Sequence, residues 1–148
     1  MLLHPPGLLP YELLPHWPYA RAVDQDLTER GIPPGSVRVE RTGREHGETM
    51  YIVFGWDVSR TVRPGGIRLT WQEETGWSYA FLGRLGRVSP CGPLRPLHRV
   101  FSLPESIGEV ADMLVRSRHT PSGSYGAEWE GADAVRAAIG AFRSGVVG

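Results

Sequence analysis

The hydrophobic and polar positions of the chain follow two periods, one typical of helices and one typical of strands. Apolar residues recur at helical spacing from Trp17 to Gly31, where Pro18 suits the first turn and Gly31 suits the cap. After IPPGS the period becomes two: Ser36 to Arg41 alternates apolar and polar residues, and Thr49 to Trp56 is more fully apolar. The pattern predicts a helix, then an edge-like strand, then a central strand.

The stretch LTWQEETGWSYAFLG predicts a hairpin, with strands over Ile67 to Glu73 and Trp77 to Leu82. A three-residue loop of Glu74, Thr75 and Gly76 would place Gly76 in the left-handed conformation. The expected register pairs Glu73 with Trp77, Trp71 with Tyr79, and Leu69 with Phe81.

In that register the four aromatic side chains of the hairpin share one face. We expect them to form a core ladder; the alternative is a stacking surface for a ligand. The opposite face, which we expect to be partly wet, carries Arg68, Thr70, Gln72, Ser78 and Ala80.

The second half of the chain predicts a loop followed by two helices. Gly83 to Arg99 is rich in glycine, proline and arginine, which favours a loop, and Val100 to Leu103 could add a short strand. The sequence SLPE, from Ser102 to Glu105, has the pattern of a capping box before an amphipathic helix that closes near His119. A last helix is expected from about Glu128 to Phe142.

These elements predict an α+β fold: an antiparallel sheet of four or five strands, covered on one face by helices, with an extra C-terminal helix. We divide the chain into a proline/leucine-rich arm at 1–16, the α+β domain at 17–119, and a linker with the last helix at 120–148. The arm is expected to cover the domain's own apolar surface or to fill a groove in a second copy, so a homodimer is possible.

Composition indicates a soluble globular protein. The chain has 41% apolar and 22% charged residues and a formal net charge of zero, and no apolar run approaches the ~20 residues of a membrane span. Prolines interrupt the first 15 residues, unlike the apolar core of a signal peptide, and a single cysteine, Cys91, fits a reducing compartment. We therefore expect a cytoplasmic protein that does not enter a membrane.

Arginine supplies all 16 basic residues, and the chain has neither lysine nor asparagine, which indicates a high-GC genome. The span 75–104 has no acidic residue, and its basic residues are Arg84, Arg87, Arg95, His98 and Arg99. This local positive segment could contact an acidic protein surface or nucleic-acid phosphates.

Residues typical of catalysis or of metal binding are scattered along the chain. Cys91 has His98 seven residues downstream, but nothing in the loop fixes the contact that an activated thiolate needs. The five histidines lack metal-ligand spacing, and there is no P-loop or nucleophile elbow. We therefore predict no catalytic residue, no metal and no cofactor.

The function expected from these observations is that of a nonenzymatic binding module, of an adaptor, immunity or chaperone-like type. Its expected partner is another macromolecule, first of all a protein, and the expected contacts are Arg84, Arg87, Arg95, Arg99, Arg68, Thr70 and Gln72. One alternative is a nucleic-acid-associated regulator that uses the arginine-containing loop 84–99. A third reading is a small enzyme built on Cys91 and His98, or on a carboxylate such as Glu73.

Three stretches, PYARAVDQDLTERGIP, LTWQEETGW and PESIGEVADMLV, resemble a family of small actinobacterial domains with no assigned function. In that family an amphipathic helix precedes a sheet with a W-x-E-x-x-G-W-like hairpin, and a helix with a P-E-x-V-like start follows. The resemblance covers roughly residues 18–118. It implies a host group and a fold, and it implies no catalytic residues.

Overall fold

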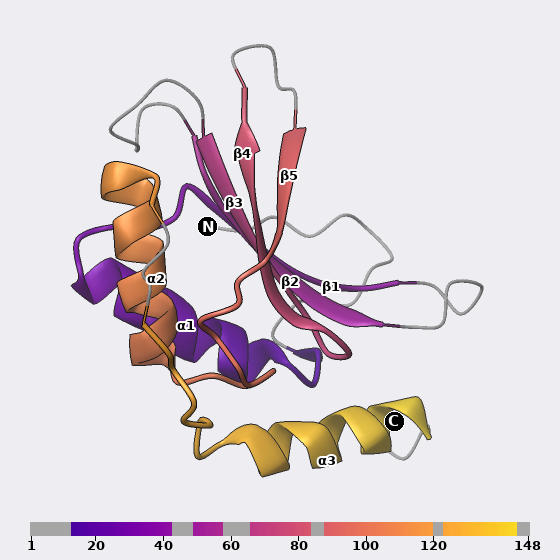
Figure 1. The fold of residues 1–148 in the computed structure, drawn as a ribbon. Helices are drawn as coiled ribbons and strands as arrows, with labels where there is room; N and C mark the ends of the chain where they lie inside the picture. The colour runs from indigo at the N-terminus through magenta and orange to yellow at the C-terminus, as the bar shows by residue number, and fades with distance from the viewer. Residues whose placement is uncertain (1–12, 43–48, 58–65, 84–87, 120–122, 145–148) are drawn as a thin grey trace.

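The computed structural model describes residues 13–42, 49–57, 66–83, 88–119 and 123–144, and it confirms the predicted fold class. Five antiparallel strands form one sheet in the order β1-β2-β3-β4-β5, and three helices accompany it (Figure 1). The elements are α1 (Trp17–Glu29), β1 (Ser36–Arg41), β2 (Met50–Trp56), β3 (Gly66–Gln72), β4 (Gly76–Leu82), β5 (Val88–Pro93), α2 (Pro104–Ser117) and α3 (Ala132–Arg143). None of the described helices is long and apolar enough to cross a membrane.

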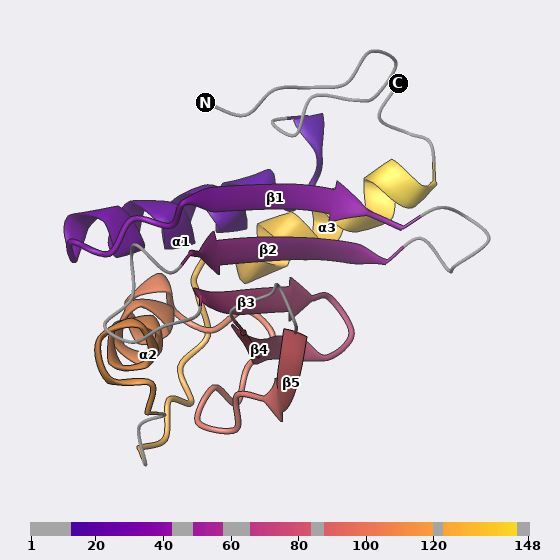
Figure 2. The ribbon, with the colours of Figure 1, turned by 90° about the horizontal axis from the view of Figure 1, so that it is seen from above.

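The core lies between one face of the sheet and the helices. Figure 2 looks onto the sheet, with α1 and α3 passing behind β1 and β2. The alternating burial of β2 and β3 turns one set of side chains toward the helices: Met50, Ile52, Phe54, Trp56, Ile67, Leu69 and Trp71. We call this the inner face and the opposite side the outer face. The two tryptophans that flank the hairpin bend, Trp71 and Trp77, are buried on the inner face, as predicted.

Tyr19 of α1 joins the helices to the sheet through its hydroxyl group. The hydroxyl donates to the carbonyl oxygen of Ser102 at 2.7 Å and accepts a hydrogen bond from Nε1 of Trp77 at 3.2 Å. Burial raises the pKa of Tyr19, so this hydroxyl keeps its proton and its role as a donor. The ring packs edge-on against Trp71 and Phe101. One side chain thereby fixes how α1, the hairpin and the segment before α2 fit together.

The predicted hairpin register was wrong by two residues. Trp71 lies opposite Trp77, Leu69 opposite Tyr79, and Ile67 opposite Phe81. The loop consists of Glu73, Glu74 and Thr75, and Gly76, at φ +81°, is already paired with Gln72. Glu73 is held elsewhere, because its N–H donates to the Met50 carbonyl at 3.1 Å and its carboxylate accepts from the Met50 N–H at 2.9 Å. A shift of two preserves the faces, so the predicted sides of the hairpin are right.

The fifth strand lies in a stretch predicted as a loop. β5 pairs with β4 along the edge that β3 leaves free. It contains Pro90 and Pro93, which an edge strand tolerates because its unpaired side needs no N–H donor. Gly92, at φ +95°, sits where the register shifts between Tyr79 and Ala80. The predicted strand at 100–103 is absent from the described residues apart from a single bridge, between Ser102 and Glu128.

Both later helices begin after the predicted positions. The capping box is not formed, because the Ser102 hydroxyl donates to the carbonyl of Arg99 at 2.7 Å and α2 starts at Pro104 without a side-chain cap. α3 starts at Ala132, since Glu128 is engaged in the bridge to Ser102. The buried side of α3 belongs to the same hydrophobic core as α1 and the sheet.

Two helical glycines should respond to alanine with opposite signs. A Cβ at Gly108 of α2 would lie 1.8 Å from Asp26 Oδ2 and 2.2 Å from Arg30 Nε, so the Asp26–Arg30 ion pair would have to move. We expect Gly108→Ala to lower the free energy of unfolding by about 1–3 kcal/mol. A Cβ at Gly140 of α3 would meet nothing within 4 Å, so Gly140→Ala should raise the free energy of unfolding by about 0.5–1 kcal/mol. Urea denaturation followed by circular dichroism measures both; equal effects would contradict the packing of α2 on α1.

Candidate functional site

The outer face of the sheet is polar, in contrast to the inner face. β1, β2 and β3 alternate, so every second residue points away from the helices. Over β1, β2 and β3 on this face lies a hollow of about 360 Å³, lined by Arg38, Thr42, Thr49, Tyr51, Val53, Arg68, Thr70 and Gln72. We call it the sheet hollow. Three neighbouring strands and the ends of the β1–β2 connection therefore supply guanidinium, hydroxyl and amide groups to one concave surface.

Arg68 stands on β3, the central strand of the sheet, and lines the sheet hollow. It is half-buried, and within the described part of the chain it has neither an ion pair nor a hydrogen bond. Its register partners, Gly55 on β2 and Ala80 on β4, offer no acceptor side chain. A guanidinium carries five N–H donors in a planar fork that matches a carboxylate or a phosphate. Arg68 therefore presents donor groups that no described residue uses.

A second group of polar side chains lines the β1 side of the sheet hollow. The Tyr51 hydroxyl donates to the carboxylate of Glu40, and Arg38 Nη1 lies 3.8 Å from the same carboxylate. Burial, followed by the hydrogen bond to Glu40, raises the pKa of Tyr51 to about 12, so the phenol stays protonated. The carboxylate of Glu40 thus already has Tyr51 and Arg38 as partners, and the N–H donors of Arg68 remain without an acceptor among the described residues.

Backbone and hydroxyl contacts fix the end of the hollow near the hairpin bend. The Thr49 N–H donates to Thr42 Oγ1 at 2.6 Å, and the Thr49 hydroxyl donates to Glu74 Oε1 at 3.0 Å. Glu40, through Tyr51, and Glu74, through Thr49, therefore place two carboxylates beside the lining of the hollow. Their charge opposes a long polyanion but leaves room for a single carboxylate at Arg68.

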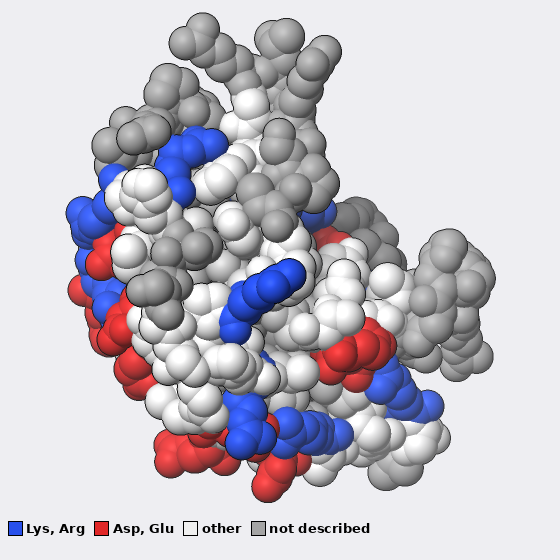
Figure 3. All heavy atoms as spheres, in the orientation of Figure 1, with Lys and Arg blue, Asp and Glu red and all other residues white. Residues whose placement is uncertain are grey.

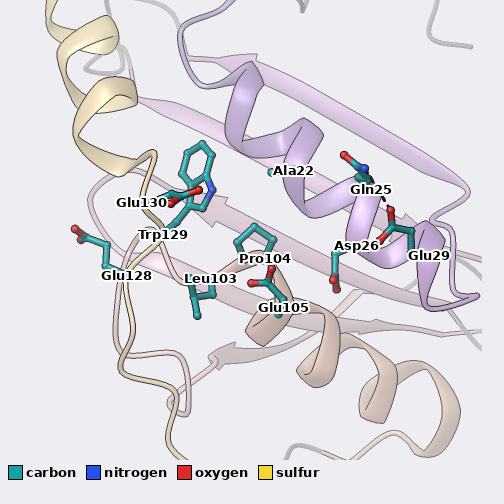
Figure 4. A pocket seen from close by; sticks show the side chains of 10 residues that line it. All are labelled: Ala22, Gln25, Asp26, Glu29, Leu103, Pro104, Glu105, Glu128, Trp129 and Glu130. Atoms are coloured by element: carbon teal, nitrogen blue, oxygen red, sulfur yellow. Dashed lines mark hydrogen bonds between the residues drawn. The ribbon is translucent and has the colours of Figure 1, made fainter.

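A second concave surface lies on the helical side, between α1, the start of α2 and the segment before α3. This acidic groove, of about 480 Å³, is lined by Ala22, Gln25, Asp26, Glu29, Leu103, Pro104, Glu105, Glu128, Trp129 and Glu130. Figure 4 shows Asp26 and Glu29 on the α1 side and Trp129 with Glu130 on the other, with Pro104 and Glu105 between them.

Two of the five carboxylates that line the acidic groove are neutralised by ion pairs within the fold. Asp26 pairs with Arg30 at 2.6 Å, and Glu128 pairs with Arg136 at 2.7 Å, which lowers the pKa of Glu128. On the face seen in Figure 3, acidic and basic side chains are interspersed, as the zero net charge leads one to expect. Since Arg30 and Arg136 offset part of its charge, the groove is a weaker candidate than the sheet hollow.

The predicted contact residues fall in different places. Arg68 and Gln72 meet in the sheet hollow, together with Thr70. Arg99 lies on the inner side of the sheet, because the carbonyl of the next residue, Val100, accepts a hydrogen bond from the indole N–H of the inward-facing Trp71. Arg99 Nε itself donates to the Gly126 carbonyl at 3.1 Å. Arg95 is exposed in the turn after β5, whereas Arg84 and Arg87 lie outside the described residues. The structure therefore brings three of the predicted residues together, Arg68, Thr70 and Gln72, and separates them from Arg99.

The candidate catalytic residues are placed as follows. The Cys91 side chain lies outside what the structure describes, and His98 Nε2 lies 2.7 Å from Ser124 Oγ on the surface. Glu73 forms an ion pair with Arg143 in addition to its bond to Met50. Among the described residues, no three His, Cys, Asp or Glu side chains gather to hold a metal ion.

Sequence reasoning did not select Arg38 and Tyr51, although both line the sheet hollow. The signal was available in the period-two pattern, because Arg38 and Tyr51 occupy outward positions in the two predicted strands before the hairpin. What was missing was the strand order, which places β1, β2 and β3 side by side.

Comparison of the chain with models of protein families, with curated proteins and with solved structures gives no match.

Proposed function

We propose that this protein is a noncatalytic protein-binding module whose outer sheet face binds an acidic partner, with Arg68 as the anchor. The observation that carries the proposal is a half-buried guanidinium without a partner among the described residues, set in a hollow lined by donor groups. A carboxylate placed there would satisfy the N–H groups of Arg68 with charge-assisted hydrogen bonds. Thr70 and Gln72 lie on the same strand and the same face, beyond Arg68 in the direction of the hairpin bend, so they can add neutral contacts on that side of the carboxylate.

A protein partner fits the hollow better than a nucleic acid does. Nucleic-acid affinity comes from neutralising many phosphates along a backbone, which requires an extended basic surface. The sheet hollow instead offers Arg38 and Arg68 with Glu40 and Glu74 at its margins, on a chain of zero net charge. This distribution supports recognition of a short acidic segment.

Selection from a randomised peptide library on the immobilised protein tests the proposal. We expect the selected peptides to be enriched in Asp and Glu. Arg68→Gln should weaken their binding by about tenfold or more, because it removes a charge-assisted contact. Arg95→Gln, a change of the same kind on an exposed turn, should alter it by less than about twofold.

Three outcomes would count against this assignment. Peptides without acidic residues, or equal binding by wild type and Arg68→Gln, would remove Arg68 as the anchor. A larger loss in Arg95→Gln would move the binding surface to the arginine-containing loop. Tighter binding of a single-stranded oligonucleotide than of the selected peptides, with affinity that falls steeply as salt rises, would favour the nucleic-acid alternative.

A further inference from the structure

The free edge of β1 carries backbone groups that no strand of the described chain uses. β1 is the terminal strand of the sheet and pairs with β2 alone. The Thr42 N–H donates to the Thr49 carbonyl at 2.9 Å, and hydrogen bonds alternate along an antiparallel pair. The N–H and C=O groups of Arg38 and Glu40 therefore point toward β2, and those of Val37 and Val39 point away from the sheet.

The two edges of the sheet differ in their protection. β5 contains Pro90 and Pro93, and its pairing with β4 shifts in register between Tyr79 and Ala80. Both features hinder the addition of a further strand at this edge. β1 is a regular strand of six residues with neither proline nor glycine. On the outer face its side chains follow in the order Ser36, Arg38, Glu40, so on that face one cation and one anion stand two residues apart, while Arg41 lies on the side of Val37 and Val39.

We propose that β1 pairs in antiparallel fashion with β1 of a second copy of the chain, around a two-fold axis at Val39, to form a continuous ten-stranded sheet. With the axis at Val39, Arg38 of each copy lies opposite Glu40 of the other, which gives two attractive cross-strand pairs. An axis at residue 38 would place Arg38 of one copy opposite Arg38 of the other. An axis at residue 40 would likewise place the two Glu40 side chains opposite each other. The outer-face charges of β1, Arg38 and Glu40, are therefore self-complementary in this register and repulsive in its two neighbours.

An exposed apolar side chain stands next to the same edge. Leu13 is 63% exposed, the highest value for a large apolar residue among those described. Three residues later, His16 Nε2 lies 3.0 Å from the Glu40 carbonyl and so ties this segment to β1. In Figure 2 the segment that leads into α1 lies beyond the free side of β1. A second copy added at β1 would offer Leu13 a surface on which to pack.

Charge exchange between two variants tests the pairing. We expect the wild-type chain to sediment as a dimer. Arg38→Glu places two acidic residues opposite two acidic residues, and Glu40→Arg places basic opposite basic, so each should raise the dimer dissociation constant by about tenfold or more. An equimolar mixture of the two variants restores both attractive pairs and should form a heterodimer. Analytical ultracentrifugation measures all four samples, and circular dichroism establishes that each variant is folded.

The outcomes separate this inference from the proposed function. A wild-type monomer at every concentration, or variants that remain dimeric alone, would overturn pairing through β1. Variants that become monomeric but do not associate when mixed would also overturn it, because the opposing charges would then not be partners. Arg68→Gln provides the control, since Arg68 lies two strands away from the edge and should leave the molecular mass unchanged.

Discussion

Replacing Trp71 with alanine is expected to lower the free energy of unfolding by about 4 kcal/mol, a large part of the total stability of a domain of this size. Trp71 is fully buried on β3, and its indole N–H donates to the Val100 carbonyl at 2.7 Å. Its ring contacts Tyr19 at 5.6 Å and Phe101 at 5.2 Å between centroids. The change therefore leaves a cavity and an unpaired carbonyl between the sheet and the segment before α2. Denaturation by urea, followed by circular dichroism, measures the loss.

Two further variants divide that loss into its parts. Trp71→Phe keeps most of the apolar volume but leaves the Val100 carbonyl without its donor, so we expect an intermediate cost of about 1–3 kcal/mol. Trp129→Ala removes the same side chain from a half-buried position and should cost less than Trp71→Ala. Equal losses in Trp71→Ala and Trp129→Ala would mean that the rings of the hairpin do not form the core.

Periodicity in the sequence was sufficient to predict the layers of the fold. Each residue of a regular strand or amphipathic helix selects its side by its own polarity, so local patterns identified α1, β1 and the faces of the hairpin. The same logic placed Arg68 and Gln72 on the wetter side of the sheet. These predictions succeed because burial is decided residue by residue.

Features that depend on contacts distant in sequence could not be predicted in this way. The hairpin register is fixed by Glu73, which bonds to β2 and pairs with Arg143 of α3, and neither contact is visible in the hairpin sequence. β5 forms because β4 presents an unpaired edge, although its own sequence is typical of a loop. Arg38 and Tyr51 join the sheet hollow only through the order of the strands.

The proposed dimer would place two sheet hollows on one continuous outer face. Side chains at residues 38 and 40 point outward in both copies, so the hollows would lie on the same side of the joined sheet, related by the axis at Val39. A partner with two acidic segments could then engage both, and its overall affinity would exceed that of either segment. Self-association through β1 and recognition through Arg68 would thus reinforce each other; Arg38 contributes to both, whereas Arg68 serves recognition alone.

Acidification is expected to destabilise the fold through His16. The imidazole is fully buried; its Nε2 lies 3.0 Å from the Glu40 carbonyl and 2.9 Å from the Tyr51 carbonyl, and it stacks on Trp71. Nδ1 is buried without a partner among the described residues. The neutral ring with its proton on Nε2 fits this site, whereas a second proton on Nδ1 would have no acceptor. Burial accordingly lowers the pKa of His16 below 6.5, although the two carbonyl contacts act in the opposite direction.

The sign of the effect follows from proton binding in the two states. In the unfolded chain His16 takes up a proton as the pH falls through about 6.5, while in the folded chain it stays neutral until its lower pKa is reached. The stability that His16 contributes is therefore complete above pH about 6.5 and decreases below it, by at most about 1.4 kcal/mol per pH unit.

The matched control is His16→Gln, which keeps an N–H donor for the carbonyls and cannot titrate. The raised pKa of Asp24 acts in the opposite direction but is present in both proteins, so it cancels from their difference. Urea denaturation from about pH 8 to about pH 5 should show the difference between wild type and His16→Gln shrinking as the pH falls. Parallel curves would show that the imidazole accepts its second proton without cost, and hence that Nδ1 has access to an acceptor in the folded protein.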